Sequence, residues 1–288
     1  MSLADRRSVG RALSFVRAVV RLYRERNIPF MAGSIAYAAF ISLIPTVLLL
    51  LVAASVVGGE PLQAYVLDLT EQYLTPTSQG VLEQSIATAA DQVGLSVLGG
   101  IALIWAVLKV FRSLDTAFAE LYGAPSNPGI VDQVTDGFVV AAVMLTVVLT
   151  TVATATVLAA ASAGSLSAIA GLPVASALPV VRAVGFVALV VGLVLAFLPI
   201  YYLFPDVPMR IREALPGAFV AALGWTALQA LFQVYVAMSS ASQLYGVVGA
   251  VILIITWLYF GAVVVLLGVA TNVVLSGRAP RREYGDRA

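Results

Sequence analysis

The sequence predicts an all-α polytopic membrane protein with six transmembrane helices, both termini in the cytoplasm, and an outer helical hairpin between helices one and two. Three observations support this fold class. Of the 288 residues, 61% are hydrophobic and 11% are charged, whereas a soluble domain carries roughly 25% charged residues. Six stretches are apolar and long enough to cross a bilayer, which takes about 20 residues each. The basic residues are concentrated in alternate connections, as the positive-inside rule requires.

The first element is an Arg-rich amphipathic segment, residues 1–29, which we expect to form a helix over 5–25 and to lie in the cytoplasm. Its apolar positions share one arc of a helical wheel and most of its seven arginines share another. This pattern indicates either an interfacial helix on anionic lipid or a leader that only sets the orientation. The apolar arc consists of Val9, Leu13, Val16, Val20 and Tyr23.

The transmembrane domain follows over residues 30–275, and residues 276–288 form a cytoplasmic tail. We place its spans at about 30–57, 94–111, 137–163, 183–204, 215–238 and 247–275. The outer hairpin covers about 60–93 and turns near Pro76. With this topology fifteen of the sixteen basic residues are cytoplasmic, and Arg182 is on the other side. An odd number of spans would separate the termini and spoil this asymmetry.

The missing residue types exclude several kinds of site. The chain contains neither histidine nor cysteine, so a zinc finger, a Ser–His triad, a catalytic thiol and a disulfide are all excluded. A net charge of +1 does not favour nucleic-acid binding. We therefore expect no metal, no cofactor and no nucleic-acid partner.

Two basic residues lie close to the membrane at the cytoplasmic end of the second span. Lys109 is the single lysine of the sequence, and Arg112 follows it by three residues. Lys109 either extends to the interface like many lysines at helix ends, or forms with Arg112 a basic site for an anionic small molecule or a lipid headgroup.

Polar residues inside the predicted spans are candidates for a pathway because they are costly in lipid. Trp225, Gln229 and Gln233 form a stripe at i, i+4 and i+8, which serves either as hydrogen-bonding glue between helices or as a substrate lining. Pro45 breaks the hydrogen bonding of the first span. Pairs of small residues such as Gly217 and Ala221 allow close packing within the chain or in a homo-oligomer.

Several motifs in the right order resemble the YihY/BrkB family of inner-membrane proteins. The resemblance covers roughly residues 30–275. It is carried by the first-helix motif around Tyr37, Ser42 and Pro45, by Arg112 with Tyr122-Gly123, and by Tyr201-Tyr202-Leu203-Phe204-Pro205-Asp206, Leu215-Pro216-Gly217-Ala218, Leu244-Tyr245-Gly246, Trp257-Leu258-Tyr259 and Gly268 through Asn272. The family often has a glutamate where this chain has Ala270, so any mechanism that needs that carboxylate is in doubt here.

The resemblance implies a multi-pass protein of the cell membrane with membrane lipids as partners. Members of the family have been labelled as a tRNA-processing ribonuclease and as a serum-resistance factor. Hydrolytic RNA cleavage needs an acidic metal cluster or a histidine pair. Because the carboxylates here are scattered and histidine is absent, we expect no enzyme.

We expect a transporter or a lipid-translocating, lipid-handling protein; the alternative is a scaffold or envelope-biogenesis partner that moves nothing. A pathway would run between helices one, five and six, with Lys109 and Arg112 at its cytoplasmic mouth. Its candidate lining residues are Tyr37, Ser42, Pro45, Trp225, Gln229, Gln233, Tyr245 and Asn272.

Overall fold

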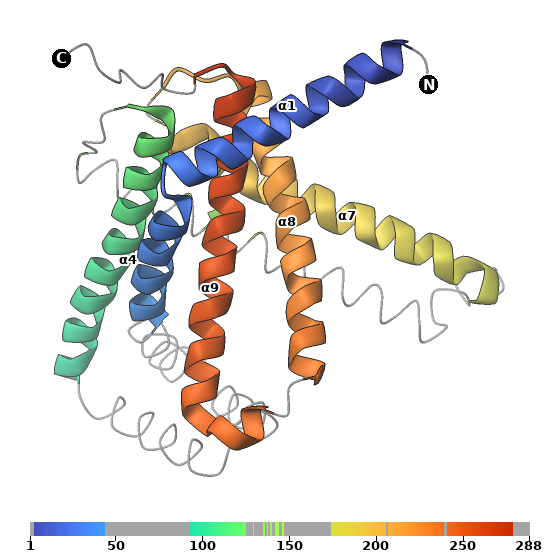
Figure 1. The fold of residues 1–288 in the computed structure, drawn as a ribbon. Helices are drawn as coiled ribbons and strands as arrows, with labels where there is room; N and C mark the ends of the chain where they lie inside the picture. Colours follow the sequence, from blue (N-terminus) through green and yellow to red (C-terminus); the bar gives the residue numbers. More distant parts are fainter. Residues whose placement is uncertain are drawn as a thin grey trace, which may run out of the picture. The chain divides into compact units, whose positions relative to one another are not determined.

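The computed structural model describes residues 3–43, 93–124, 174–205, 207–238 and 241–278, together with single residues between 129 and 146. All regular structure in these ranges is helical (Figure 1), so the all-α prediction is confirmed there. The labelled helices are α1 (Leu3–Glu25), α4 (Val93–Tyr122), α7 (Val174–Leu203), α8 (Ile211–Met238) and α9 (Ala241–Leu275), and a further helix covers Ile28–Leu43. The chain divides into two compact units, one of Met1–Ala36 with Phe111–Ala288 and one of Tyr37–Val110.

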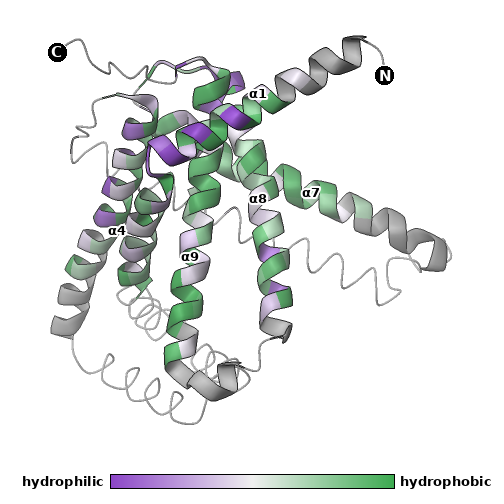
Figure 2. Cartoon of the chain, viewed as in Figure 1, coloured by the Kyte–Doolittle hydropathy of each residue, from purple (hydrophilic) through white to green (hydrophobic). Residues whose placement is uncertain are grey.

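Three helices of the described part are long and apolar enough to cross a membrane: Gly185–Leu203, Ile211–Tyr235 and Val251–Leu275. They match the predicted fourth, fifth and sixth spans, and Figure 2 shows hydrophobic residues along α7, α8 and α9. The shorter apolar helix Ile28–Leu43 begins where the first span is predicted, and α4 contains the second. Most of the third span and the outer hairpin lie outside the described residues. Six spans and two cytoplasmic termini therefore stay predictions.

The N-terminal helix predicted over 5–25 is present as α1, and the chain turns sharply at its end. Asn27 has a φ of 49°, a left-handed conformation that asparagine adopts more readily than most residues. The amides of Phe30 and Met31 donate to the Asn27 carbonyl at 2.9 and 3.2 Å, which starts the next helix. Beside this turn, Arg26 forms an ion pair with Glu120 of α4 at 2.7 Å.

Helix α8 packs against both α7 and α9, and α8 and α9 run side by side in opposite directions (Figure 1). Aromatic side chains from α7, α8 and α9 contact one another. The Trp225 ring lies 5.9 Å from that of Phe197 and 5.3 Å from that of Trp257, edge to face in both pairs. Such pairs add about 0.5–1.5 kcal/mol beyond the area that they bury, so Trp225 ties the three helices together.

A second aromatic cluster joins the end of α4 to the end of α7. Phe118 is fully buried, and its ring lies 6.1 Å from Tyr201 and 5.5 Å from Phe204. Tyr201 and Phe204 therefore have a packing role at this end of the larger unit.

Candidate functional site

The Lys109 ammonium group lies between two aromatic rings in the unit Tyr37–Val110. Its Nζ is 5.2 Å from the centre of the Tyr37 ring and 5.3 Å from that of the Trp105 ring. Trp105 precedes Lys109 by one turn of α4, which places both on the same helix face. Tyr37 comes from the helix Ile28–Leu43. The structure thus brings together a predicted pathway residue and a predicted headgroup residue.

This aromatic pair lies at the surface of the chain. The Tyr37 and Trp105 side chains are 58% and 61% exposed, and Lys109 is half-buried between them. A cation near an aromatic face is stabilised by about 0.5–1 kcal/mol at an exposed site and by more where water is absent. An ammonium group in this position has N–H donors that can bind an anion. We call Tyr37, Trp105 and Lys109 the lysine cage.

Arg112 lies further along α4 and is exposed. Its carbonyl accepts a hydrogen bond from the Thr116 hydroxyl at 2.7 Å. The prediction that Arg112 joins Lys109 in one basic site stays a prediction.

The Asn272 side chain bonds to the backbone of the neighbouring helix. It is almost fully buried, accepts a hydrogen bond from the Gly217 amide at 2.6 Å, and donates one to the Ala214 carbonyl at 3.3 Å. Pro216 lies between these two residues and carries no amide proton, so α8 has an irregular hydrogen-bonding pattern here. In this arrangement the Asn272 amide connects α9 to α8.

Two glycines allow the close contact at this crossing. A Cβ on Gly217 would lie 2.5 Å from the Gly268 carbonyl oxygen, and a Cβ on Gly268 would lie 2.7 Å from the Gly217 carbonyl oxygen. Larger residues would therefore push the helices apart. The buried Tyr201 hydroxyl, which also borders Gly268, donates to the Val265 carbonyl at 2.8 Å. We call Tyr201, Gly217, Gly268 and Asn272 the helix crossing.

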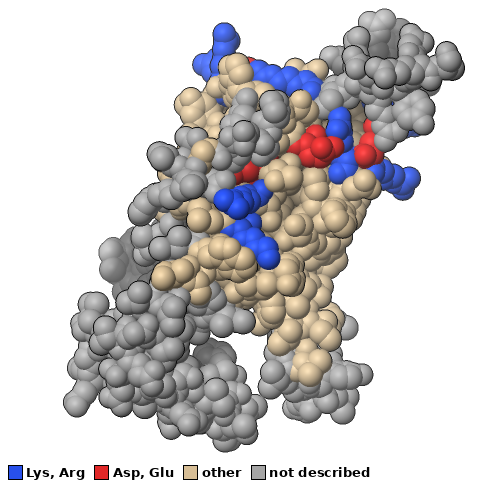
Figure 3. All heavy atoms as spheres, turned by 90° about the vertical axis from the view of Figure 1, so that its left-hand side faces the viewer, with Lys and Arg blue, Asp and Glu red and all other residues tan. Residues whose placement is uncertain are grey.

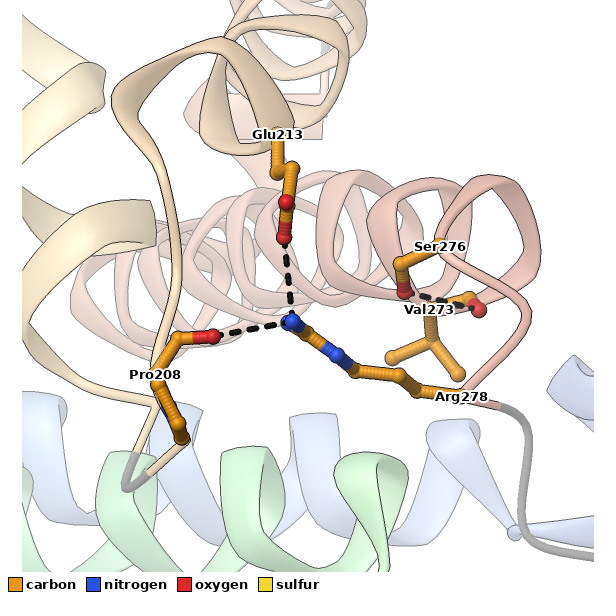
Figure 4. A network of polar contacts seen from close by, with 5 residues as sticks. All are labelled: Pro208, Glu213, Val273, Ser276 and Arg278. Carbon is orange, nitrogen blue, oxygen red and sulfur yellow. Dashed lines mark hydrogen bonds and ion pairs between the residues drawn. The ribbon is translucent and has the colours of Figure 1, made fainter.

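An ion pair closes the end of the same helix pair (Figure 4). Arg278, just after α9, lies 3.1 Å from Glu213 in the first turn of α8 and donates to the Pro208 carbonyl at 2.8 Å. The Tyr122 hydroxyl at the end of α4 is buried nearby, and no described residue provides it with a well-formed hydrogen bond. Burial raises the pKa of Tyr122 from 10.0 to about 12, although the positive charge of Arg278 opposes the shift.

The three residues of the predicted polar stripe on α8 do not share one environment in the structure. Trp225 packs between α7 and α9, whereas Gln229 and Gln233 are exposed on the described surface of the chain. Whether these glutamines line a pathway or bond to another helix stays a prediction.

The remaining pathway candidates are placed only in part. The Ser42 hydroxyl donates to the Ala39 carbonyl of its own helix at 2.7 Å. Tyr245 belongs to α9, but its side chain is not among those described, and Pro45 lies outside the described residues. Ala270, at the position where the family often has glutamate, is fully buried.

Residue-by-residue reasoning missed the bonding partners of Asn272 and the ion pair of Glu213 with Arg278. The available signal was the run Leu215 to Ala218 together with Gly268, because a proline beside a glycine in one span and a glycine in another are typical of a close helix crossing. Gly217 is predicted from the sequence to allow close packing, but its partners in α9 are not.

Comparison with known proteins gives one family and several relatives. The family model described as virulence factor BrkB matches residues 19–288. A UPF0761 membrane protein of Aromatoleum aromaticum is 26% identical and is matched over 96% of this chain and 68% of its own length. A UPF0761 membrane protein of Chlorobium luteolum is 27% identical, over 94% of this chain and 63% of its own length. The ribonuclease-like protein YfkH of Bacillus subtilis is 24% identical, over 92% and 96%. No solved structure matches.

Proposed function

The chain belongs to the virulence factor BrkB family of membrane proteins, and from that premise we propose that it is a lipid-handling protein of the cell membrane. Its ligand is an anionic phospholipid, and its headgroup site is the lysine cage. The observation that carries this proposal is the position of the Lys109 ammonium group between the Tyr37 and Trp105 rings.

The chemistry of the lysine cage suits a lipid headgroup. Tryptophan and tyrosine concentrate at the level of the headgroups because their rings are apolar and their N–H and O–H groups are polar. A lysine at this level attracts anionic lipid by about 1 kcal/mol. Two exposed aromatic side chains beside the cation give the acyl chain and the glycerol a surface to contact, so the site recognises the phosphate and the lipid body together.

Brominated lipids provide a direct test because they quench nearby tryptophan. The full chain is placed in bilayers that contain either brominated phosphatidylglycerol or brominated phosphatidylcholine, and the quenching of Trp105 is obtained by subtracting a Trp105→Phe variant. We expect phosphatidylglycerol to quench more strongly, and Lys109→Gln to lower this preference about fivefold, since one exposed charged contact is worth about 1 kcal/mol.

Two variants control for other effects of the substitution. Lys109→Arg keeps the positive charge and is expected to keep most of the preference, and Arg112→Gln removes an exposed charge elsewhere on α4. If Lys109→Gln leaves the preference for phosphatidylglycerol unchanged, or if Arg112→Gln removes it equally, the lysine cage is not the headgroup site.

A scaffold that binds lipid or a partner without moving anything is the second candidate. It is favoured by the close packing of α8 and α9 at the helix crossing, where Asn272 and two glycines leave no space for a substrate. Vesicles with fluorescent phospholipid in both leaflets separate the two candidates. A handling protein that translocates lipid exposes the inner-leaflet fluorophore to an external reductant, whereas a scaffold leaves it protected.

A further inference from the structure

We infer that α1 is a surface-binding helix whose partner is the anionic leaflet of the membrane in which the protein is embedded. The binding surface is an apolar row of Leu13, Val16 and Val20 with Arg17, Arg21 and Arg24 beside it. This inference does not rest on the proposed function, because it concerns a different surface and needs no lipid at Lys109.

The apolar row is exposed on the surface of the described part of the chain. Leu13, Val16 and Val20 are 52%, 54% and 46% exposed, and their spacing of three and four residues places them on one helix face. A different face of α1 packs on the protein, where Leu22 is buried. The helix therefore has two apolar surfaces, and the chain covers one of them.

The position of α1 is that of a helix in the plane of a membrane surface. In Figure 1, α1 lies across α9 rather than running along it, and the two helices are in contact. The Glu213–Arg278 ion pair marks where α8 begins and α9 ends. Figure 3 shows Lys and Arg side chains beside Asp and Glu side chains on the face turned to the viewer.

The turn after α1 fixes this orientation. The left-handed Asn27 redirects the chain into Ile28–Leu43, and the Arg26–Glu120 ion pair ties the turn to α4. Arg26, Asn27 and Glu120 all belong to the unit Met1–Ala36 with Phe111–Ala288. Because α1 is held in place at one end, its apolar row needs little further ordering to bind a bilayer beside it.

Charge and size favour a lipid surface over a protein partner. Arg17, Arg21 and Arg24 are exposed, and arginines beside an apolar row are attracted to an anionic leaflet. A stable protein interface buries about 1,600 Å² in total, far more than one row of three aliphatic side chains provides. For a bilayer the row is sufficient, since the spanning helices already hold α1 close to the lipid and make binding intramolecular.

The test measures the depth of α1 in the full-length protein. The natural chain has no cysteine, so a nitroxide label can be attached at a single Val16→Cys position. The reconstituted protein is compared in bilayers of phosphatidylcholine alone and with phosphatidylglycerol added. In the mixed bilayer we expect oxygen to relax the label more than a water-soluble nickel complex does. Added salt should reduce this difference because it screens the arginines.

A label at Ser14→Cys is the matched control. Ser14 is exposed and lies on roughly the opposite side of the helix from Val16, so its label should stay accessible to nickel in both bilayers. Combined replacement of Arg17, Arg21 and Arg24 by glutamine should abolish the effect of phosphatidylglycerol on the Val16 label. A Val16 label that is as accessible to nickel as the Ser14 label, or whose depth does not respond to phosphatidylglycerol, overturns the inference.

Discussion

Replacement of Asn272 by alanine tests whether one side-chain amide holds α8 and α9 together. The change removes the acceptor for the Gly217 amide and the donor to the Ala214 carbonyl, both in the buried crossing. Hydrogen bonds between membrane helices are worth about 0.6 kcal/mol on average, and a buried group that loses its partner costs roughly 1–3 kcal/mol. With two bonds lost, we expect the free energy of unfolding to fall by about 2 kcal/mol, roughly a 30-fold change in the unfolding equilibrium.

Tryptophan fluorescence during titration with dodecyl sulfate measures this loss, since Trp225 and Trp257 meet across α8 and α9 at 5.3 Å and separate when the helices part. Thr271→Ala is the matched control. Thr271 is also buried, but its hydroxyl donates to the Leu267 carbonyl of its own helix at 2.9 Å, so its removal should cost less than about 1 kcal/mol. Equal stability of the two variants would refute the assignment of the crossing to the Asn272 amide.

Four further predictions follow from the same residues. Gly268→Ala should lower stability by about 1–3 kcal/mol through overpacking, whereas Gly33→Ala, with open space around it, should be neutral or slightly stabilising in the same titration. The pKa of Tyr122 is about 12 in the folded state and 10.0 in the unfolded state, so its contribution to the free energy of unfolding should be intact below pH 10 and be lost as the pH rises toward 12. Tyr122→Phe should therefore reduce the dependence of the free energy of unfolding on pH in this range. An unchanged dependence would contradict the assignment. Purified protein should cleave no RNA with or without Mg²⁺, and cleavage that co-purifies with the chain would overturn that expectation. Single cysteines should react with an impermeant thiol reagent at Thr70 from outside and at Ser126 and Pro280 from inside, the reverse pattern being incompatible with the proposed topology.

Much of the fold follows from composition and periodicity. The predicted spans 183–204, 215–238 and 247–275 coincide with apolar parts of α7, α8 and α9, because long apolar runs have few alternatives to a helix in lipid. The amphipathic helix expected over 5–25 is present as Leu3–Glu25. The second span is predicted over 94–111 with a helical pattern that runs on towards Tyr122, and α4 does extend to Tyr122. In its last turns Leu114, Phe118 and Leu121 lie on one helix face and are buried. This face is covered by other parts of the protein rather than by lipid.

The candidate site was predictable only as separate residues. The sequence predicts a headgroup role for Lys109 and a pathway role for Tyr37, but nothing in a single sequence says that a ring from one helix covers an ammonium group from another. Asn272 is a candidate because it is a polar residue inside a predicted span, whereas Gly217 and Ala214 bind it through backbone groups, which no side-chain pattern reveals. Trp225 was grouped with Gln229 and Gln233 by helical spacing, but packing between Phe197 and Trp257 separates it from them.

The sequence by itself determined which segments prefer lipid and which face of α1 is apolar, because transfer free energies belong to the side chains and sum along a helix. Only the tertiary structure decided which residues meet. The contact of Asn272 with Gly217 joins positions 55 residues apart, and the cage around Lys109 joins two helices. Such contacts depend on the rotation of each helix about its axis, which is set by how rings and glycines fit at the crossing.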